Sequence, residues 1–267
     1  MNEIVKYSNN INQAALTGLK AGGMDLFMLL CARAKDRGTE LLTFEYAEIK
    51  KAIGLSDQNN RYVSTQFGKA CDVINTLRFK TMNETTGSCK MVILFPTCEN
   101  NPENETVIIR VNPDAIALLN EINRNFTRFE LQEFVKLESK YSKSLYRLLK
   151  QYRSTGNFGV DAEKFRELMD CSPKYTNGEF MRKSVTPAVK ELAACFPGLT
   201  VEAVRGSGRG RPIKEYRFTF QPEARTDPAA DQKPKRTTRR KNSFNNFTER
   251  QRTDADWDEL ERLALDQ

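Results

Sequence analysis

The chain has 267 residues, a formal net charge of +7 and no histidine. This length allows one or two domains with hydrophobic cores of their own. The sequence contains no apolar run long enough to cross a bilayer or to act as a signal peptide, so we expect a cytosolic protein. Without histidine the chain cannot form a Ser-His-Asp triad, a zincin motif or most zinc sites. Its six cysteines include no Cys-x-x-Cys pair, so we expect reduced thiols that fill hydrophobic cores.

The first part of the chain predicts helices followed by strands. Apolar residues at helical spacing predict helices over the ranges 24–37, 43–53, 60–77 and 113–122. Thr43 is the expected N-cap of the second of these helices. Two strands are expected over 90–95 and 106–111, with the polar stretch 98–105 between them as a hairpin loop or wing.

The second part repeats this order. A short strand is expected over 126–129, and helices over the ranges 131–137, 140–153, 161–169 and from about 177 onward. Asp161 and either Thr176 or Asn177 are the expected N-caps, and Pro187 should kink or restart the last helix. Strands are expected over 199–204 and 215–220.

One apolar stripe occurs twice, and the second copy lies 118 residues after the first. Its members are spaced at i, i+4, i+7, i+11 and i+14, as Val63, Phe67, Ala70, Ile74 and Leu77 and again as Met181, Val185, Ala188, Leu192 and Cys195. Such spacing lines one face of an α-helix. Each copy follows a shorter helix and precedes strands, which is the order of a winged helix. We therefore predict a mainly helical α+β fold with two tandem winged-helix domains, residues 1–125 and 126–221.

Positive charge is concentrated in the second domain. Residues 1–125 carry 14 basic and 14 acidic residues, whereas residues 126–220 carry 18 basic and 11 acidic residues. A protein that follows a phosphate backbone needs such a concentrated cationic surface. We therefore expect the second domain to bind DNA more strongly, although a basic, solvated face without a partner is the alternative.

The long helix that begins near Asn177 is the predicted recognition helix. Arg182 is the expected base-reading residue because its guanidinium matches guanine, and Lys183 and Lys190 are expected at phosphates, with Lys174 in the preceding turn. The first domain's equivalent helix offers Arg61 and Lys69 but lies in a neutral domain, so it should bind DNA more weakly or serve mainly for protein contacts. Ordinary exposed helix charges are the alternative for each of these residues.

The segment from Arg205 to Pro212 is rich in glycine and arginine. A phosphate-cradling loop for a nucleotide would have to open a helix, and here a strand follows. We therefore interpret it as a wing whose Arg205, Arg209, Arg211 and neighbouring Lys214 contact the DNA backbone or minor groove. A flexible, solvated turn is the alternative.

Residues 222–267 form the predicted tail. A disordered linker with a basic run, 233–241, should lead into a short acidic amphipathic segment. Phe247, Trp257, Leu260 and Leu263 are its expected anchors on a partner protein, and a purely solvating tail is the alternative. The carboxylates lack the EF-hand spacing, and we expect no catalytic, cofactor or metal site.

Four segments resemble plasmid replication initiators of the iteron-binding, theta-type Rep family. The most specific is Phe129–Arg153, and Val5–Asn10, Phe165–Leu168 and Pro187–Leu192 are also similar. The resemblance covers about residues 1–220 and implies two winged helices, of which the second reads an origin repeat while the first contacts DNA or mediates dimerisation. It also implies a monomer–dimer equilibrium, repression of the protein's own promoter, and recruitment of host proteins such as the replicative helicase.

Three functions remain open from the sequence. The first is a non-catalytic, plasmid-associated initiator that binds double-stranded DNA in a bacterial cytoplasm and has no membrane partner. The second is a transcriptional repressor of the same fold. The third, a DNA-nicking enzyme, is disfavoured by the missing histidine and by the absence of a convergent acidic cluster.

Overall fold

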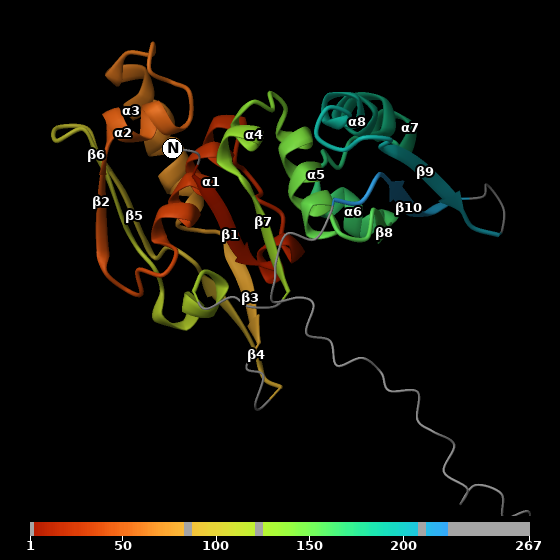
Figure 1. The fold of residues 1–267 in the computed structure, drawn as a ribbon, viewed down its shortest axis with the longest axis horizontal. Helices are drawn as coiled ribbons and strands as arrows, with labels where there is room; N and C mark the ends of the chain where they lie inside the picture. The colour runs from red at the N-terminus through yellow and green to blue at the C-terminus, as the bar shows by residue number, and fades with distance from the viewer. Residues whose placement is uncertain (1–2, 83–86, 121–124, 208–211, 224–267) are drawn as a thin grey trace, which may run out of the picture. The chain divides into compact units, whose positions relative to one another are not determined.

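Both winged helices are present in the computed structural model, which describes residues 3–82, 87–120, 125–207 and 212–223 (Figure 1). These residues lie within one unit, residues 1–224. The predictions for the tail, including its four anchors, and those for Arg209 and Arg211 lie outside the described residues. Within the described part of the chain, no helix is long and apolar enough to span a membrane.

The first winged helix contains three helices and a three-stranded sheet. Its elements are α1 (Ala21–Ala34), β2 (Leu41–Glu45), α2 (Tyr46–Ala52), α3 (Asn60–Ile74), β5 (Thr97–Asn101) and β6 (Thr106–Arg110). The strands are antiparallel in the order β2-β6-β5. All five members of the first apolar stripe are buried, and the four that lie on α3 confirm that this face covers the core. Leu77 follows the helix, which ends at Ile74 rather than at the expected residue 77.

Two predictions for this domain were wrong. Thr43 does not cap a helix but lies inside β2, opposite Ile108 of β6, and α2 begins only after Glu45. The run 41–45 alternates exposed and covered side chains, and pairing with β6 prevails over a helical start. The stretch 98–105 is not a loop, because most of β5 lies in it and only residues 102–105 form the turn.

A second hairpin and two short 3-10 helices complete this half. Strand β4 (Cys89–Ile93) pairs with β3 (Arg78–Met82). The sequence did not predict β3, because Phe79 is the one fully buried side chain among the described positions of that strand. The 3-10 helices are η1 (Asn9–Gln13) and η2 (Pro113–Leu118), so the segment expected as an α-helix from Pro113 is a shorter, tighter helix.

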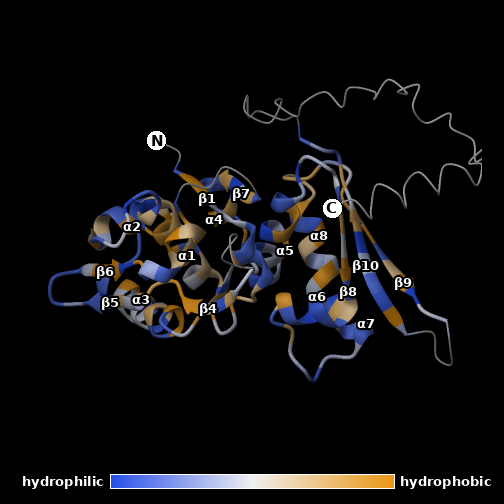
Figure 2. Cartoon of the chain, turned by 90° about the horizontal axis from the view of Figure 1, so that it is seen from below, coloured by the Kyte–Doolittle hydropathy of each residue, from blue (hydrophilic) through white to orange (hydrophobic). Residues whose placement is uncertain are grey.

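The second winged helix repeats the same order. It follows α5 (Lys140–Gln151), which packs against both modules, and its elements are β8 (Asn157–Asp161), α6 (Ala162–Leu168), α7 (Asn177–Phe180), η3 (Met181–Val185), α8 (Thr186–Leu192), β9 (Thr200–Arg205) and β10 (Ile213–Thr219). The sheet order is β8-β10-β9, and hydrophobic and hydrophilic residues interleave along β9 and β10 (Figure 2). The expected caps are confirmed, since the side chains of Asp161 and Thr176 both accept backbone hydrogen bonds.

A small sheet joins the two halves of the sequence. Strand β1 (Ile4–Ser8) pairs antiparallel with β7 (Phe126–Glu130), which leads into α4 (Leu131–Val135). The ring of Phe129 packs against Tyr7 at 6.1 Å and against Tyr146 of α5 at 5.2 Å, measured between centroids. A boundary between residues 125 and 126 would therefore separate two paired strands.

Three cations of α5 are buried rather than exposed. Lys143, Arg147 and Lys150 are among the 18 basic residues counted for residues 126–220, but each is at most 6% exposed. The ammonium of Lys143 contacts Asp25 of α1 and donates to the carbonyl of Phe134 at 2.9 Å. Because these charges are buried, they do not add to a DNA-binding surface.

Candidate nucleic-acid interface

The predicted recognition helix begins with a capping box. The Thr176 hydroxyl accepts a hydrogen bond from the Glu179 amide at 3.2 Å, and the Glu179 carboxylate accepts one from the Thr176 amide at 3.0 Å. These bonds satisfy backbone groups that the first helical turn otherwise leaves open. The Thr176 amide, together with Lys183, lowers the pKa of Glu179 to about 2. The helix therefore starts at a fixed residue.

One extra residue is accommodated early in this helix. The repeat spacing of 118 made Met181 the counterpart of Val63, but Phe180 is the fully buried residue and Met181 is only partly buried. Residues 181–185 form a π-helix, in which the Thr186 amide donates to the Met181 carbonyl five residues back. A π-turn holds one residue more than an α-turn. A buried residue of this helix therefore lies 117 positions after its counterpart in α3 before the π-turn, as Phe180 does after Val63. After the π-turn the separation is 118, as between Val185 and Phe67.

Pro187 explains why the widened turn lies there. Proline has no amide hydrogen for the carbonyl of Lys183, four residues back, and its ring would collide with that carbonyl in a regular α-helix. The π-helix ends just before Pro187, and α8 continues with Ala188 and Leu192 buried. This bears out the expected interruption and identifies it as a π-helical turn.

The predicted DNA-contacting residues of this helix lie on its outer side. Arg182, Lys183 and Lys190 are exposed, and so is Lys174 in the preceding turn. Lys183 is engaged within the protein, because its ammonium lies 3.0 Å from the Glu179 carboxylate and 4.7 Å from the centroid of the Tyr175 ring. Glu179 thus offsets part of the positive charge that this face presents.

The β9–β10 hairpin brings two more of the predicted cations to one end of the sheet of the second module. Arg205 ends β9 and Lys214 lies near the start of β10, and both are exposed. Gly206 donates from its amide to the Pro212 carbonyl at 2.8 Å. A Cβ added at Gly206 would lie 2.5 Å from Cε of Lys214, so glycine leaves the space through which this lysine side chain runs.

The first winged helix presents a different charge pattern. Arg61 and Lys69 are exposed on α3, as predicted from the helix, but three exposed carboxylates lie on the β5–β6 hairpin, those of Glu99, Glu103 and Glu105. Carboxylates repel phosphate, so this hairpin is a poor wing for DNA. The described parts of the two modules therefore share a fold and differ in the charge of their hairpins.

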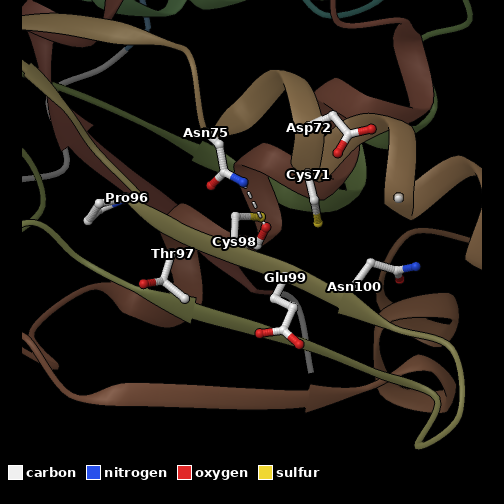
Figure 3. Close-up of a pocket in the computed structure, with 9 residues that line it drawn as sticks. Cys71, Asp72, Asn75, Pro96, Thr97, Cys98, Glu99 and Asn100 are labelled. Carbon is white, nitrogen blue, oxygen red and sulfur yellow. Dashed lines mark hydrogen bonds between the residues drawn. The ribbon is translucent and has the colours of Figure 1, made fainter.

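A hollow of about 440 Å³ lies between α3 and β5 (Figure 3). Asp72 and Glu99 are among its lining residues, and the Asn75 side chain donates to the Cys98 carbonyl at 3.0 Å across it. Its carboxylates do not suit a phosphate ligand. Among the residues that the structure describes, no group of three or more Asp, Glu, Cys or His side chains could hold a metal ion.

Sequence reasoning missed the residues that hold the recognition helix in place. Arg166 of α6 donates to the Tyr175 carbonyl at 2.6 Å, and Lys140 of α5 donates to the Asp170 carbonyl at 3.1 Å. Both contacts bridge residues that lie 9 to 30 positions apart, which helical periodicity does not reveal.

Comparisons with known proteins agree on the family and the fold. A family model described as "Initiator Replication protein, WH1" matches residues 4–150, and one described as "Initiator Rep protein, WH2" matches residues 161–220. The chain is 33% identical over 236 residues to the "Probable replication protein rep" of Bifidobacterium longum (strain NCC 2705), covering 87% of this chain and 77% of that protein. The crystal structure of Pi initiator protein in complex with iteron DNA is similar with a TM-score of 0.62 and 13% identity, over 84% of this chain and 99% of that one. At that identity the structural likeness shows a shared fold.

Proposed function

Because the chain belongs to the family of initiator replication proteins, we propose that it starts plasmid replication by binding repeated origin sequences, or iterons, as double-stranded DNA. The structurally similar Pi initiator was crystallised with iteron DNA, which supports this ligand. In our proposal the second winged helix makes the principal contact, through α7–α8 and the β9–β10 hairpin. The protein then acts as a binding platform in the bacterial cytoplasm and performs no catalysis.

The observation that carries the proposal is the unequal charge of the two modules. The second presents exposed cations on the recognition helix and at its hairpin, including Arg182, Lys190 and Lys214. The first presents Arg61 and Lys69 on its helix, and its β5–β6 hairpin carries three exposed carboxylates beside the exposed Arg110. Phosphate contacts dominate nucleic-acid affinity, so the second module should bind more tightly and the first should assist or mediate dimerisation.

The contacts of β7 support a proposal about where the two modules divide. We propose that the first domain includes β7 and α4, which pack with β1 and α1, and that the second begins with the segment after α5. The family models, which end at residue 150 and resume at residue 161, support this division. Helix α5 contributes to both cores, because it contacts α1 and α8 alike.

Footprinting on the DNA that flanks the gene would test the proposed function. Regularly spaced protected repeats are the expected result. A single protected palindrome over a promoter would instead identify a dedicated repressor, and no protection would contradict both. Incubation with supercoiled DNA and Mg²⁺ should leave the DNA intact, because specific nicking would show an enzyme.

We further propose two finer activities that the family resemblance implies. Dimers of the protein repress its own promoter, and the tail recruits host replication proteins such as the replicative helicase. The composition of the tail supports the second, since Trp257, Leu260 and Leu263 stand at helical spacing among acidic residues. Removal of residues 246–267 should leave origin binding intact and abolish replication in the host.

A further inference from the structure

The turn that precedes the recognition helix is held by the side chain of Arg166. Its guanidinium Nη2 lies 2.6 Å from the Tyr175 carbonyl oxygen and 3.4 Å from that of Ser172. Its Nη1 lies 3.4 Å from Oδ1 of Asn177, the first residue of α7. One planar cation thus contacts both ends of the turn and the start of the helix.

The guanidinium of Arg166 faces the protein rather than the outer side of the recognition helix. Its Cζ lies 5.2 Å from the centroid of the Phe180 ring, and Phe180 is fully buried. The Ser172 carbonyl also accepts from the Tyr175 amide at 3.1 Å, whereas the Tyr175 carbonyl belongs to a loop and is bound by Arg166. A cation in this place fixes a backbone path and has few donors left for a phosphate.

The first winged helix contains a similar contact, made by a lysine that binds fewer acceptors. Helices α2 and α6 both have seven residues and both follow a five-residue strand directly, and Lys50 and Arg166 are the fifth residue of each. The Lys50 ammonium lies 2.9 Å from Oδ1 of Asn60, which is the first residue of α3, as Asn177 is of α7. Both modules therefore join a cation of the shorter helix to an asparagine at the start of the longer one.

We propose that Arg166 is a positioning residue that sets the orientation of the recognition helix on DNA, and that Lys50 does the same for α3. The inference rests on the proposed DNA-binding function. Arginine offers several donors in one plane and holds three acceptors, whereas lysine in the first module holds one. The module that we expect to read sequence therefore has the more rigid turn. Base reading requires such rigidity, because hydrogen bonds to base edges fail with small displacements, while contacts to phosphates tolerate them.

The test compares full-length Arg166→Gln, Arg166→Lys and a matched control, Lys164→Gln. Lys164 lies on the same helix, is exposed, and pairs only with Glu167 among the contacts described for its side chain. Affinity is measured over a range of salt concentrations for two duplexes, one carrying the sequence that the wild-type protein protects and one of random sequence. Amide hydrogen exchange of the free proteins is measured in parallel.

We expect Arg166→Gln to lower affinity for the protected sequence by roughly tenfold to a hundredfold and to change affinity for the random duplex by less than about threefold, at an unchanged salt slope. Arg166→Lys should lie between this variant and the wild type. Amides of residues 172–183 should exchange faster in Arg166→Gln, whereas those of α5 and β10 should not change. The Lys164→Gln control should match the wild type in both measurements.

Two results would overturn the proposal. Equal weakening on both duplexes, with the salt slope reduced by about one, would make Arg166 a phosphate contact. Unchanged discrimination together with unchanged exchange over residues 172–183 would show that the turn holds its shape without Arg166. If the wild-type protein bound neither duplex, the proposed function would fail, and the exchange measurement on the free proteins would still decide whether Arg166 fixes the turn.

Discussion

Replacement of Lys143 by methionine tests how α1 and α5 are held together. The Lys143 ammonium contacts the Asp25 carboxylate and donates to the Phe134 carbonyl at 2.9 Å, and its side chain is 1% exposed. Burial lowers the pKa of Lys143 and raises that of Asp25 to about 6, even with the lysine as its partner. Without the lysine, the buried carboxyl group has no cation and must stay protonated in the native state.

The size of the effect follows from the pKa of Asp25. A carboxyl group that titrates near 3.8 in the unfolded chain and stays protonated in the native state destabilises the fold by about 4 kcal/mol at pH 7. The wild-type protein already bears about 3 kcal/mol of this cost because its Asp25 titrates near 6, so Lys143→Met adds about 1.4 kcal/mol at pH 7 and close to zero at pH 4. The sign follows from the raised pKa, since the stabilisation is fully present below pH 3.8 and is lost as the pH rises. The destabilisation by Lys143→Met should therefore shrink as the pH falls from 7 to 4.

Urea titration at several pH values measures this. Lys143→Met should lose about 1.4 kcal/mol of unfolding free energy at pH 7, and Asp25→Asn in the same chain should restore most of it, because asparagine carries no charge to bury. Lys136→Met, which removes a lysine that the structure shows exposed, is the control and should change stability by less than about 0.5 kcal/mol. A loss that was the same at pH 4 and pH 7, or that the double variant did not recover, would refute the reasoning.

Three further predictions concern DNA. Arg182→Ala should weaken binding to the specific site by about 1–3 kcal/mol and relax its sequence preference, and equal weakening on random duplex in a competition assay would contradict base reading. Glu179→Gln keeps a capping-box side chain and releases Lys183, so it should tighten binding to every duplex and steepen the salt dependence; an unchanged slope would mean that Lys183 does not meet phosphate. Joint replacement of Arg209 and Arg211 by Ala should flatten the slope by about one unit for each lost phosphate contact, and the same slope as wild type would remove the loop from the interface.

The fold was predictable where one helix buries one face. The stripe from Val63 to Leu77 and the caps Asp161 and Thr176 required only local spacing and local hydrogen bonds, and the structure confirms them. Strands β2 and β8 were not predicted, although the same element precedes the shorter helix in both modules. Each has five residues and few fully buried side chains, so its identity depends on a partner strand far along the chain.

Charge at the candidate site was only partly readable from the sequence. A count of residues placed Lys143, Arg147 and Lys150 with the basic surface, but α5 is covered on several sides and its cations are buried. Conversely, the role of Arg166 could not be predicted from helical periodicity, because its partners are carbonyls of a turn. Composition gives the sum of the charges, and packing decides which of them face solvent.

The central claim is that the second winged helix makes the principal contact with DNA. The most direct measurement is the salt-dependent affinity of two matched full-length double variants for the protected duplex, Arg182→Ala with Lys190→Ala in the second module and Arg61→Ala with Lys69→Ala in the first. We predict that the first pair loses more affinity and more of the salt slope than the second. Equal losses, or a larger loss from the pair in the first module, would contradict the account.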